Sequence, residues 1–330
     1  MTTAFVLSGG GSLGAVQVGM LAALHERRIE PDLLVGTSAG ALNAAYLAAR
    51  GFDGDCIDQL GQLWRHLRRA DVFPFDPLRQ ALACVGRRPS LCSSGPLRRV
   101  VEANLPIADL GDAKIPLHIV TTDVMSGEEV ILSEGDAISS VLASAAIPAV
   151  FPSVEVGGRT LMDGGVSDNT AVSQAIALGA DRVVVLPTGY ACALAAPPTT
   201  PLSAAMHSLT LLIEQRLIRE VAGLVDEVEI VILPPLCPLS VSSVNFTRTN
   251  QLMTRAHGSS GRWLDSDRAT VTHPEQVLSL HSHPIAPPPA GGTHTIDEEN
   301  PLNRTESRPS AAEAGPRAGS PATPTRSAAR

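Results

Sequence analysis

A serine enclosed by glycines is the group in this sequence best suited to do chemistry. The pattern Gly36-Thr37-Ser38-Ala39-Gly40 directly follows the apolar run Leu33-Leu34-Val35. Between a strand and a helix, Gly-x-Ser-x-Gly forms a nucleophile elbow, a turn so tight that glycines must flank the serine. The serine hydroxyl then lies at a helix N-terminus, which favours developing negative charge. Ser38 is therefore a candidate nucleophile, although the pattern alone also fits a serine that only caps a helix.

A second glycine-rich turn precedes the serine in the sequence. It reads Gly9-Gly10-Gly11-Ser12-Leu13-Gly14 and follows the apolar run Ala4-Phe5-Val6-Leu7. A turn of this kind offers several backbone N–H groups to an anion. Two adjacent parallel strands would bring both turns side by side, one carrying the nucleophile and the other an oxyanion hole. Gly9, Gly10, Gly11 and Gly14 are the candidate residues of this hole.

An aspartate followed by two glycines forms a third element. Leu161-Met162-Asp163-Gly164-Gly165 comes after the segment Val154-Glu155-Val156-Gly157-Gly158-Arg159, which is typical of a tight hairpin. Taken alone, an aspartate at a strand end fits a simple turn.

Several motifs in the same order resemble those of the patatin-like phospholipases, over roughly residues 4–190 and more weakly to about residue 264. They are Gly9 to Gly14 followed by Gln17, Gly19 and Leu21; Gly36 to Gly40; Ala143 to Pro148 with Phe151-Pro152; Asp163-Gly164-Gly165 with Asn169; and Gly179-Ala180-Asp181. A set of motifs in register is far more specific than any single one.

The resemblance implies a Ser-Asp catalytic dyad on a three-layer α/β core, with a mostly parallel sheet and helices on both faces. Ser38 would attack an ester carbonyl, Asp163 would act as general base, and N–H groups around Gly10 and Gly11 would hold the oxyanion. A carboxylate with an ordinary pKa near 4 is a poor base, so the site must be tight and dry. The implied enzyme hydrolyses lipid esters and needs neither a metal nor an organic cofactor. Phospholipids, lysophospholipids, acylglycerols and small esters all remain candidate substrates.

Two positions depart from the family pattern. Leu13 stands where many members carry arginine or lysine, which leaves the headgroup preference open. Ala171 stands where a proline is common, two residues after Asn169, and this difference has little bearing on the chemistry.

Three alternative interpretations compete with this one. Gly9, Gly11 and Gly14 also fit a dinucleotide-binding fingerprint, but the acidic residue that should end the second strand is absent. His207 lies downstream in the order of a Ser-Asp-His triad, but near the start of a predicted long helix. A lipid-binding protein without catalysis is the third alternative, although both dyad residues are present.

Composition limits the class of protein. The chain has 330 residues, a hydrophobic fraction of 44% and a net charge of −8, which allows a large core and argues against nucleic-acid binding. Five scattered cysteines form no C-x-x-C pattern, so we expect reduced, mostly buried thiols and no zinc site. We find no signal peptide and no long apolar run, so we expect a soluble cytoplasmic protein that meets membranes only at their surface.

Strand, glycine turn and helix alternate at the start of the chain, which indicates a parallel sheet covered by helices. We predict helices over 15–27, 39–50, 53–69, 136–146, 170–178, 203–225 and 249–264, and strands over 116–122, 129–132, 182–186 and 228–233. Residues 70–115 show no clear pattern and could form a lid. We expect one acyl hydrolase domain over 1–264 and a disordered tail over 265–330, which lacks aromatic residues and is rich in proline, serine and alanine.

Positive charge is concentrated in one segment of this acidic chain. Between Leu60 and Leu105 there are eight arginines and three acidic residues, a net charge of +5. Trp64, Phe73 and Phe75 lie in the same segment and suit an interface. We expect this segment to border the active-site mouth and to contact an anionic membrane; the alternative is a set of solvated helix faces.

Overall fold

An eight-stranded, mostly parallel β-sheet organises the computed structural model, which describes residues 1–189, 197–225, 227–237, 239, 241–266 and 278. The strand order is β5-β6-β3-β2-β1-β7-β8, and β4 pairs with β3 off this path. The pairs β1–β2, β1–β7, β2–β3 and β7–β8 are parallel, whereas β3–β4, β3–β6 and β5–β6 are antiparallel. The strands are β1 (Thr3–Leu7), β2 (Leu33–Thr37), β3 (Leu117–Asp123), β4 (Glu129–Leu132), β5 (Val154–Val156), β6 (Arg159–Asp163), β7 (Arg182–Leu186) and β8 (Glu229–Ile232).

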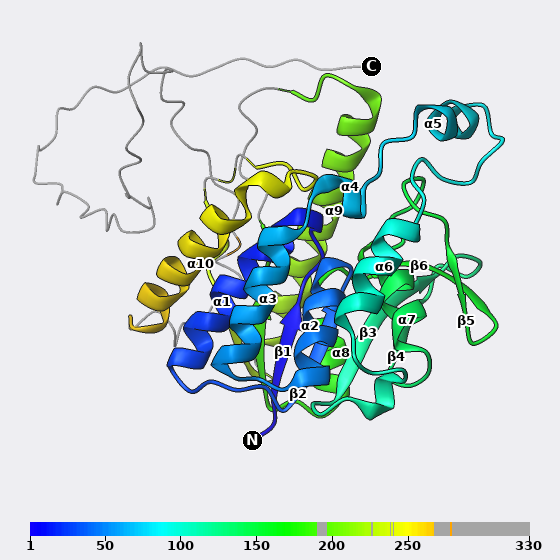
Figure 1. The fold of residues 1–330 in the computed structure, drawn as a ribbon. Helices are drawn as coiled ribbons and strands as arrows, with labels where there is room; N and C mark the ends of the chain where they lie inside the picture. The colour runs from blue at the N-terminus through cyan, green and yellow to red at the C-terminus, as the bar shows by residue number, and fades with distance from the viewer. Residues whose placement is uncertain (190–196, 226, 238, 240, 267–277, 279–330) are drawn as a thin grey trace, which may run out of the picture. The chain divides into compact units, whose positions relative to one another are not determined.

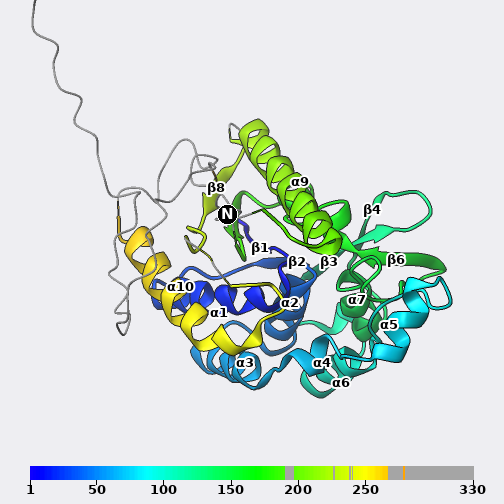
Figure 2. The ribbon, with the colours of Figure 1, turned by 90° about the horizontal axis from the view of Figure 1, so that it is seen from above.

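Helices cover both faces of this sheet (Figure 1, Figure 2). Helices α1, α2, α3, α6, α7 and α10 contribute to one hydrophobic cluster, and α8 and α9 to a second one. Their bounds are α1 (Gly14–Glu26), α2 (Ala39–Arg50), α3 (Gly54–His66), α4 (Arg69–Val72), α5 (Pro77–Cys84), α6 (Gly95–Asn104), α7 (Ala137–Ser144), α8 (Val172–Ala177), α9 (Pro201–Leu224) and α10 (Thr249–Leu264). The predicted three-layer α/β class is confirmed.

The interior strand β1 shows why two helical layers form. In β1, Phe5 and Leu7 belong to the first cluster, whereas Ala4 and Val6 belong to the second. Successive side chains of a strand point to opposite faces, so an unbroken apolar run must be covered on both sides. All four of these side chains are buried, and β1 therefore lies in the interior of the sheet.

Residues 70–115, which had no clear sequence pattern, contain short helices. Helix α4 has four residues, and α5 has eight, none of them buried. Helix α3 ends at His66 instead of reaching the predicted residue 69, because Leu67 takes an extended conformation and buries its side chain. The segment therefore leaves the helical layer earlier than its amphipathic pattern indicates.

The expectation of mostly buried thiols holds for only half of the described cysteines. Cys56 and Cys92 are buried, Cys237 is half-buried and Cys84 is exposed, all as free thiols, while Cys192 lies outside the described residues. Within the described part of the chain, no helix combines the length and the apolarity that crossing a membrane requires.

Two residues beyond the predicted domain boundary at 264 contact the core. Asp265 pairs with Arg27 at 2.6 Å, and Leu278 is buried in the second hydrophobic cluster. The described residues belong to one compact unit, Met1–Ala286. Most of the predicted tail, 265–330, lies outside the described residues, so its disorder stays a prediction.

Candidate active site

The two glycine turns and the aspartate meet at one edge of the sheet. In the parallel pair of β1 and β2, Leu7 stands opposite Gly36, so both strands end together and their turns emerge side by side. Strand β6 pairs with β3 so that Asp163 stands opposite Thr121. This pairing brings Asp163 to the serine across 125 positions of sequence.

Ser38 lies in a strained backbone conformation between β2 and α2. Its φ of 54° and ψ of −117° are rare for a residue with a side chain, and its side chain is largely buried. A Cβ atom on Gly40 would collide with the carbonyl oxygen of Leu7, so α2 can pass this close to β1 only with glycine there. The strand-to-helix turn is therefore the tight elbow that the Gly-x-Ser-x-Gly pattern predicts.

A hydrogen bond joins Ser38 to Asp163. The Ser38 hydroxyl donates to Asp163 Oδ2 at 2.8 Å, and the Gly165 amide donates to Oδ1 at 2.8 Å. Burial raises the pKa of Asp163 to about 6, and the bonds from Gly165 and Ser38 act in the opposite direction. The carboxylate is thus a stronger base than an exposed aspartate.

No histidine of the described chain hydrogen-bonds with Ser38 or Asp163. His207, the candidate third member of a triad, lies half-buried on α9. Both oxygens of Asp163 are already engaged by the serine and by Gly165. The geometry among the described residues is that of a pair rather than a triad.

The four candidate oxyanion glycines divide into two kinds. The Gly9 amide donates to the Asn169 carbonyl at 3.3 Å, and the Gly14 amide is directed to the Gly11 carbonyl. The amides of Gly10 and Gly11 donate to no described residue. Two of the four therefore shape the turn, and two keep N–H groups available to a ligand.

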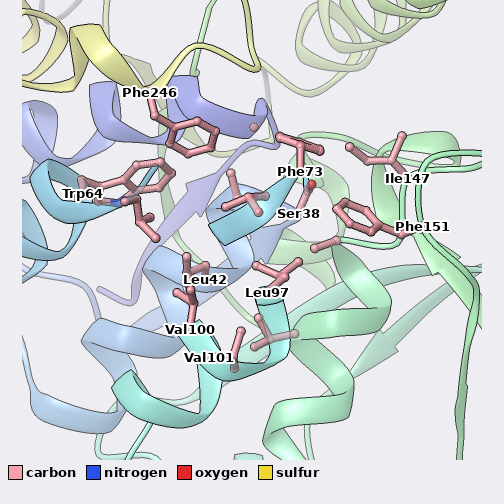
Figure 3. Close-up of a pocket in the computed structure, with 16 residues that line it drawn as sticks. Ser38, Leu42, Trp64, Phe73, Leu97, Val100, Val101, Ile147, Phe151 and Phe246 are labelled. Atoms are coloured by element: carbon pink, nitrogen blue, oxygen red, sulfur yellow. The ribbon is translucent and has the colours of Figure 1, made fainter. Parts of the chain in front are cut away.

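An apolar pocket adjoins Ser38 (Figure 3). Its cavity volume is about 50 Å³, and Gly11 lies in its wall. Aromatic rings build much of that wall: Trp64 stacks with Phe246 at 6.4 Å between centroids, and Phe73 stacks with Phe151 at 5.5 Å. Aliphatic side chains of α6, namely Leu97, Val100 and Val101, complete one side. The wall beside the serine is therefore mostly hydrocarbon.

Comparison with known proteins identifies the family. The family model described as Patatin-like phospholipase matches residues 5–176, more than half of the chain. The protein belongs to the patatin-like phospholipase family. The matched stretch includes Ser38 and Asp163.

Relatives of this patatin-like protein are longer than the matched region. "Lysophospholipase nte1" of Aspergillus terreus is 29% identical over 184 residues, which cover 56% of this chain and 12% of that protein. An uncharacterized NTE family protein of Mycobacterium bovis is 27% identical over 188 residues, covering 56% of this chain and 48% of that protein. Among solved structures, VipD from Legionella pneumophila aligns over 80% of this chain and 66% of its own, with 16% identity and a TM-score of 0.41.

A buried polar network behind the patatin-like site escaped sequence analysis. Asn43 on α2 donates to Gln17 at 2.8 Å and accepts from the Trp64 indole at 2.7 Å. Gln17 donates in turn to the carbonyls of Ser8 and Leu186, each at 2.9 Å. The network ties the glycine turn, the elbow helix and the pocket wall together. In the sequence, Gln17 belongs to the family motifs and Asn43 is a polar residue inside an alanine-rich helix, but neither position shows that the two side chains meet.

A second buried carboxylate, Asp168, fixes the loop after Asp163. It accepts from the Thr170 amide at 2.9 Å and pairs with Arg216 at 3.1 Å, while Thr37 donates to its carbonyl at 3.3 Å. Burial and the nearby Glu220 raise the pKa of Asp168 to about 7. Among the described residues, no group of three or more histidine, cysteine or acidic side chains could hold a metal ion.

Proposed function

We propose that this protein is a serine-dependent lipid acyl hydrolase of the phospholipase A, lysophospholipase or esterase type. The observation that carries the proposal is the hydrogen bond from Ser38 to a buried Asp163, 2.8 Å long, beside an apolar pocket. Membership of the patatin-like phospholipase family supports a lipid ester as the substrate.

In the proposed acylation step, Ser38 Oγ attacks the carbonyl carbon of the ester while its proton moves to Asp163 Oδ2. The tetrahedral oxyanion accepts hydrogen bonds from the amides of Gly10 and Gly11, which have no described acceptor in the free protein. The alcohol leaves as the ester bond breaks and takes the proton from Asp163. An acyl-enzyme remains on Ser38.

In the proposed deacylation step, water attacks the acyl carbonyl while Asp163 takes a proton from it. The second tetrahedral intermediate collapses, Ser38 Oγ leaves and recovers the proton, and the fatty acid is released. A carboxyl with a pKa of about 6 suits both directions of transfer near neutral pH, because it both accepts and returns the proton readily. The apolar pocket holds the acyl chain, and the leaving alcohol faces the open side.

The test combines active-site labelling with product analysis. The purified protein is treated with a fluorophosphonate probe, and mass spectrometry then identifies the labelled residue, expected to be Ser38. Incubation with a mixed lipid extract should release fatty acids, and Ser38→Ala should abolish both labelling and release. Ser208→Ala serves as the control, since Ser208 is exposed on α9. A label on another residue, or unchanged release by Ser38→Ala, would refute the proposal.

A further inference from the structure

We propose that residues 68–88, here called the arginine arm, dock the protein on the surface of a membrane that contains anionic phospholipid. This docking proposal rests on the proposed lipid hydrolase function, which gives the protein a reason to bind a membrane. Its test measures vesicle binding separately from ester hydrolysis. The arm contains α4 and α5 and lies in the segment between the end of α3 and the start of α6.

The arm exposes large apolar side chains that the fold does not use. Helix α5 buries no residue and lies apart from the helices that cover the sheet (Figure 1). Phe75 and Leu78 are each 70% exposed, and Val85 is 69% exposed. Leaving such groups in water is unfavourable, so a cluster of them within eleven residues indicates a surface that is covered in use.

Ion pairs with other described residues do not neutralise the positive charges around these side chains. Of the eight arginines between Leu60 and Leu105, Arg98 alone forms an ion pair with another described residue, Glu102 at 3.6 Å. The two acids of the arm serve as helix caps instead: Asp71 accepts from the Arg68 amide and Asp76 from the Arg79 amide. Arg79 donates to the Ser90 hydroxyl at 2.8 Å, and the arm's other guanidinium groups have no ion-pair partner among the described residues, on a chain whose net charge is −8.

The partner that fits this surface is an anionic lipid bilayer. Aromatic and leucine side chains enter the headgroup region, while arginines remain at the level of the phosphates. Each basic residue near an anionic membrane adds to the attraction, and salt screens it. If the arm instead bound another protein, its affinity for vesicles would not depend on the charge of the lipids.

The arm also adjoins the pocket that holds the proposed substrate. Val72 and Phe73, which belong to the arm, line the pocket beside Ser38, and Figure 3 shows Phe73 next to Ser38. Phe73 is two residues from the exposed Phe75, so their Cα atoms lie within about 7 Å along the chain. A bilayer that contacts Phe75 would thus lie close to a residue of the pocket wall.

The experiment measures co-sedimentation of the full chain with vesicles of phosphatidylcholine alone and of phosphatidylcholine mixed with phosphatidylglycerol. We expect binding that grows with phosphatidylglycerol and weakens with salt. The double variant Arg87→Gln, Arg88→Gln should bind the mixed vesicles roughly 10- to 30-fold more weakly. The matched control is Arg219→Gln, Arg262→Gln, which removes the same charge from exposed positions on α9 and α10.

A second pair of variants tests the apolar contacts. Leu78→Ser should weaken binding, whereas Leu212→Ser should not, because Leu212 is equally exposed, at 70%, but lies on α9. Both should hydrolyse a short soluble ester like the wild type. Equal sedimentation with both vesicle types, or arm variants that behave like their controls, would overturn the proposal.

Binding and hydrolysis can fail independently. Anionic vesicle binding by a protein that hydrolyses no ester would support the docking surface and refute the proposed function. Hydrolysis of a soluble ester without preference for anionic vesicles would refute the docking surface and leave the hydrolase intact.

Discussion

The backbone amide of Ser38 donates a hydrogen bond to the hydroxyl of Ser144 at 2.8 Å, and this hydroxyl donates in turn to the carbonyl of Val120 at 2.6 Å. Ser144 is fully buried at the end of α7, and Val120 lies on β3. One hydroxyl therefore holds the strained backbone of Ser38 against the sheet. This contact makes Ser144 a positioning residue for the proposed nucleophile.

Replacing Ser144 with alanine should lower kcat about 10- to 100-fold with little change in KM. The buried amide of Ser38 would lose its acceptor, and a buried polar group without a partner costs about 1–3 kcal/mol. Ser144→Thr should restore much of the activity because it keeps the hydroxyl. Ser140→Ala is the control, since Ser140 is equally buried on α7 and bonds only within its helix, to the Asp136 carbonyl. Equal kcat values for the two alanine variants would contradict the role of Ser144.

Removing either member of the Ser38–Asp163 pair should nearly abolish ester hydrolysis. Ser38→Ala is expected to lose roughly 10⁴- to 10⁶-fold in kcat, and Asp163→Asn nearly as much, because an amide cannot accept the proton. His207→Ala should stay within about threefold of the wild type. Turnover of a chromogenic ester gives the rates, and circular dichroism shows whether each variant is folded. A large loss in folded His207→Ala would favour a triad.

The pH dependence of kcat/KM should show an acidic limb governed by Asp163. Its pKa is raised to about 6 by burial, so the carboxylate becomes protonated below that pH and activity should fall about tenfold per pH unit. Asp168→Asn is a useful control, because the pKa of Asp168 is also raised, to about 7. If Asp163 is the base, the limb should remain near pH 6 in this variant. If the acidic limb disappeared in Asp168→Asn, the titrating group would be Asp168, and the role of Asp163 as general base would be contradicted.

Asp163→Asn should stabilise the folded protein at pH 8. Burial raises the pKa of Asp163 from 3.8 to about 6, so between these values the folded state keeps a proton that the unfolded state has released. Stability from this group therefore falls as the pH rises from about 4 to 6, and at pH 8 the buried charge costs about 3 kcal/mol. Thermal unfolding of the wild type and the variant at pH 4 and pH 8 measures the effect. The difference should be large at pH 8 and small at pH 4; the reverse order would contradict the pKa shift.

We expect the two candidate ends of the domain to give chains of different stability. A chain ending at Leu264 lacks the Asp265–Arg27 pair and the buried side chain of Leu278, whereas a chain ending at Ala286 retains both. We expect the longer form to match the full chain in Tm and turnover. The shorter form should melt several degrees lower, because losing a buried leucine typically costs about 2–5 kcal/mol. Identical Tm values would place the boundary at 264.

The proposed chemistry was predictable because its residues lie in local motifs. The glycines around Ser38 indicate a tight strand-to-helix turn at that position. Two successive strand-turn-helix units predict that β1 pairs with β2. Asp163 was found through the family resemblance, since an aspartate before two glycines has a simpler explanation as a turn. Its pairing with Ser38 depends on the antiparallel contact of β6 with β3.

The supporting contacts were not predictable because they join distant positions. Ser144 is 106 residues from Ser38, and Trp64 reaches Asn43 from another helix. The spacing of apolar residues along the sequence does not indicate contacts of this kind. The positive charge of the arm was visible in the sequence, but helix α5 within it was not predicted, because it buries no side chain and so has no buried apolar face to indicate a helix.

The walls of the pocket and the Ser38–Asp163 pair come from different parts of the chain. The pair lies at the sheet edge, whereas Leu97, Val100 and Val101 come from α6 and make none of the hydrogen bonds that hold Ser38 or Asp163. Under the proposed function, substitutions in α6 would change the preferred acyl chain without disturbing the Ser38–Asp163 pair. For the same reason, varying these three positions together is a direct way to engineer selectivity for the length of the acyl chain in the proposed substrate.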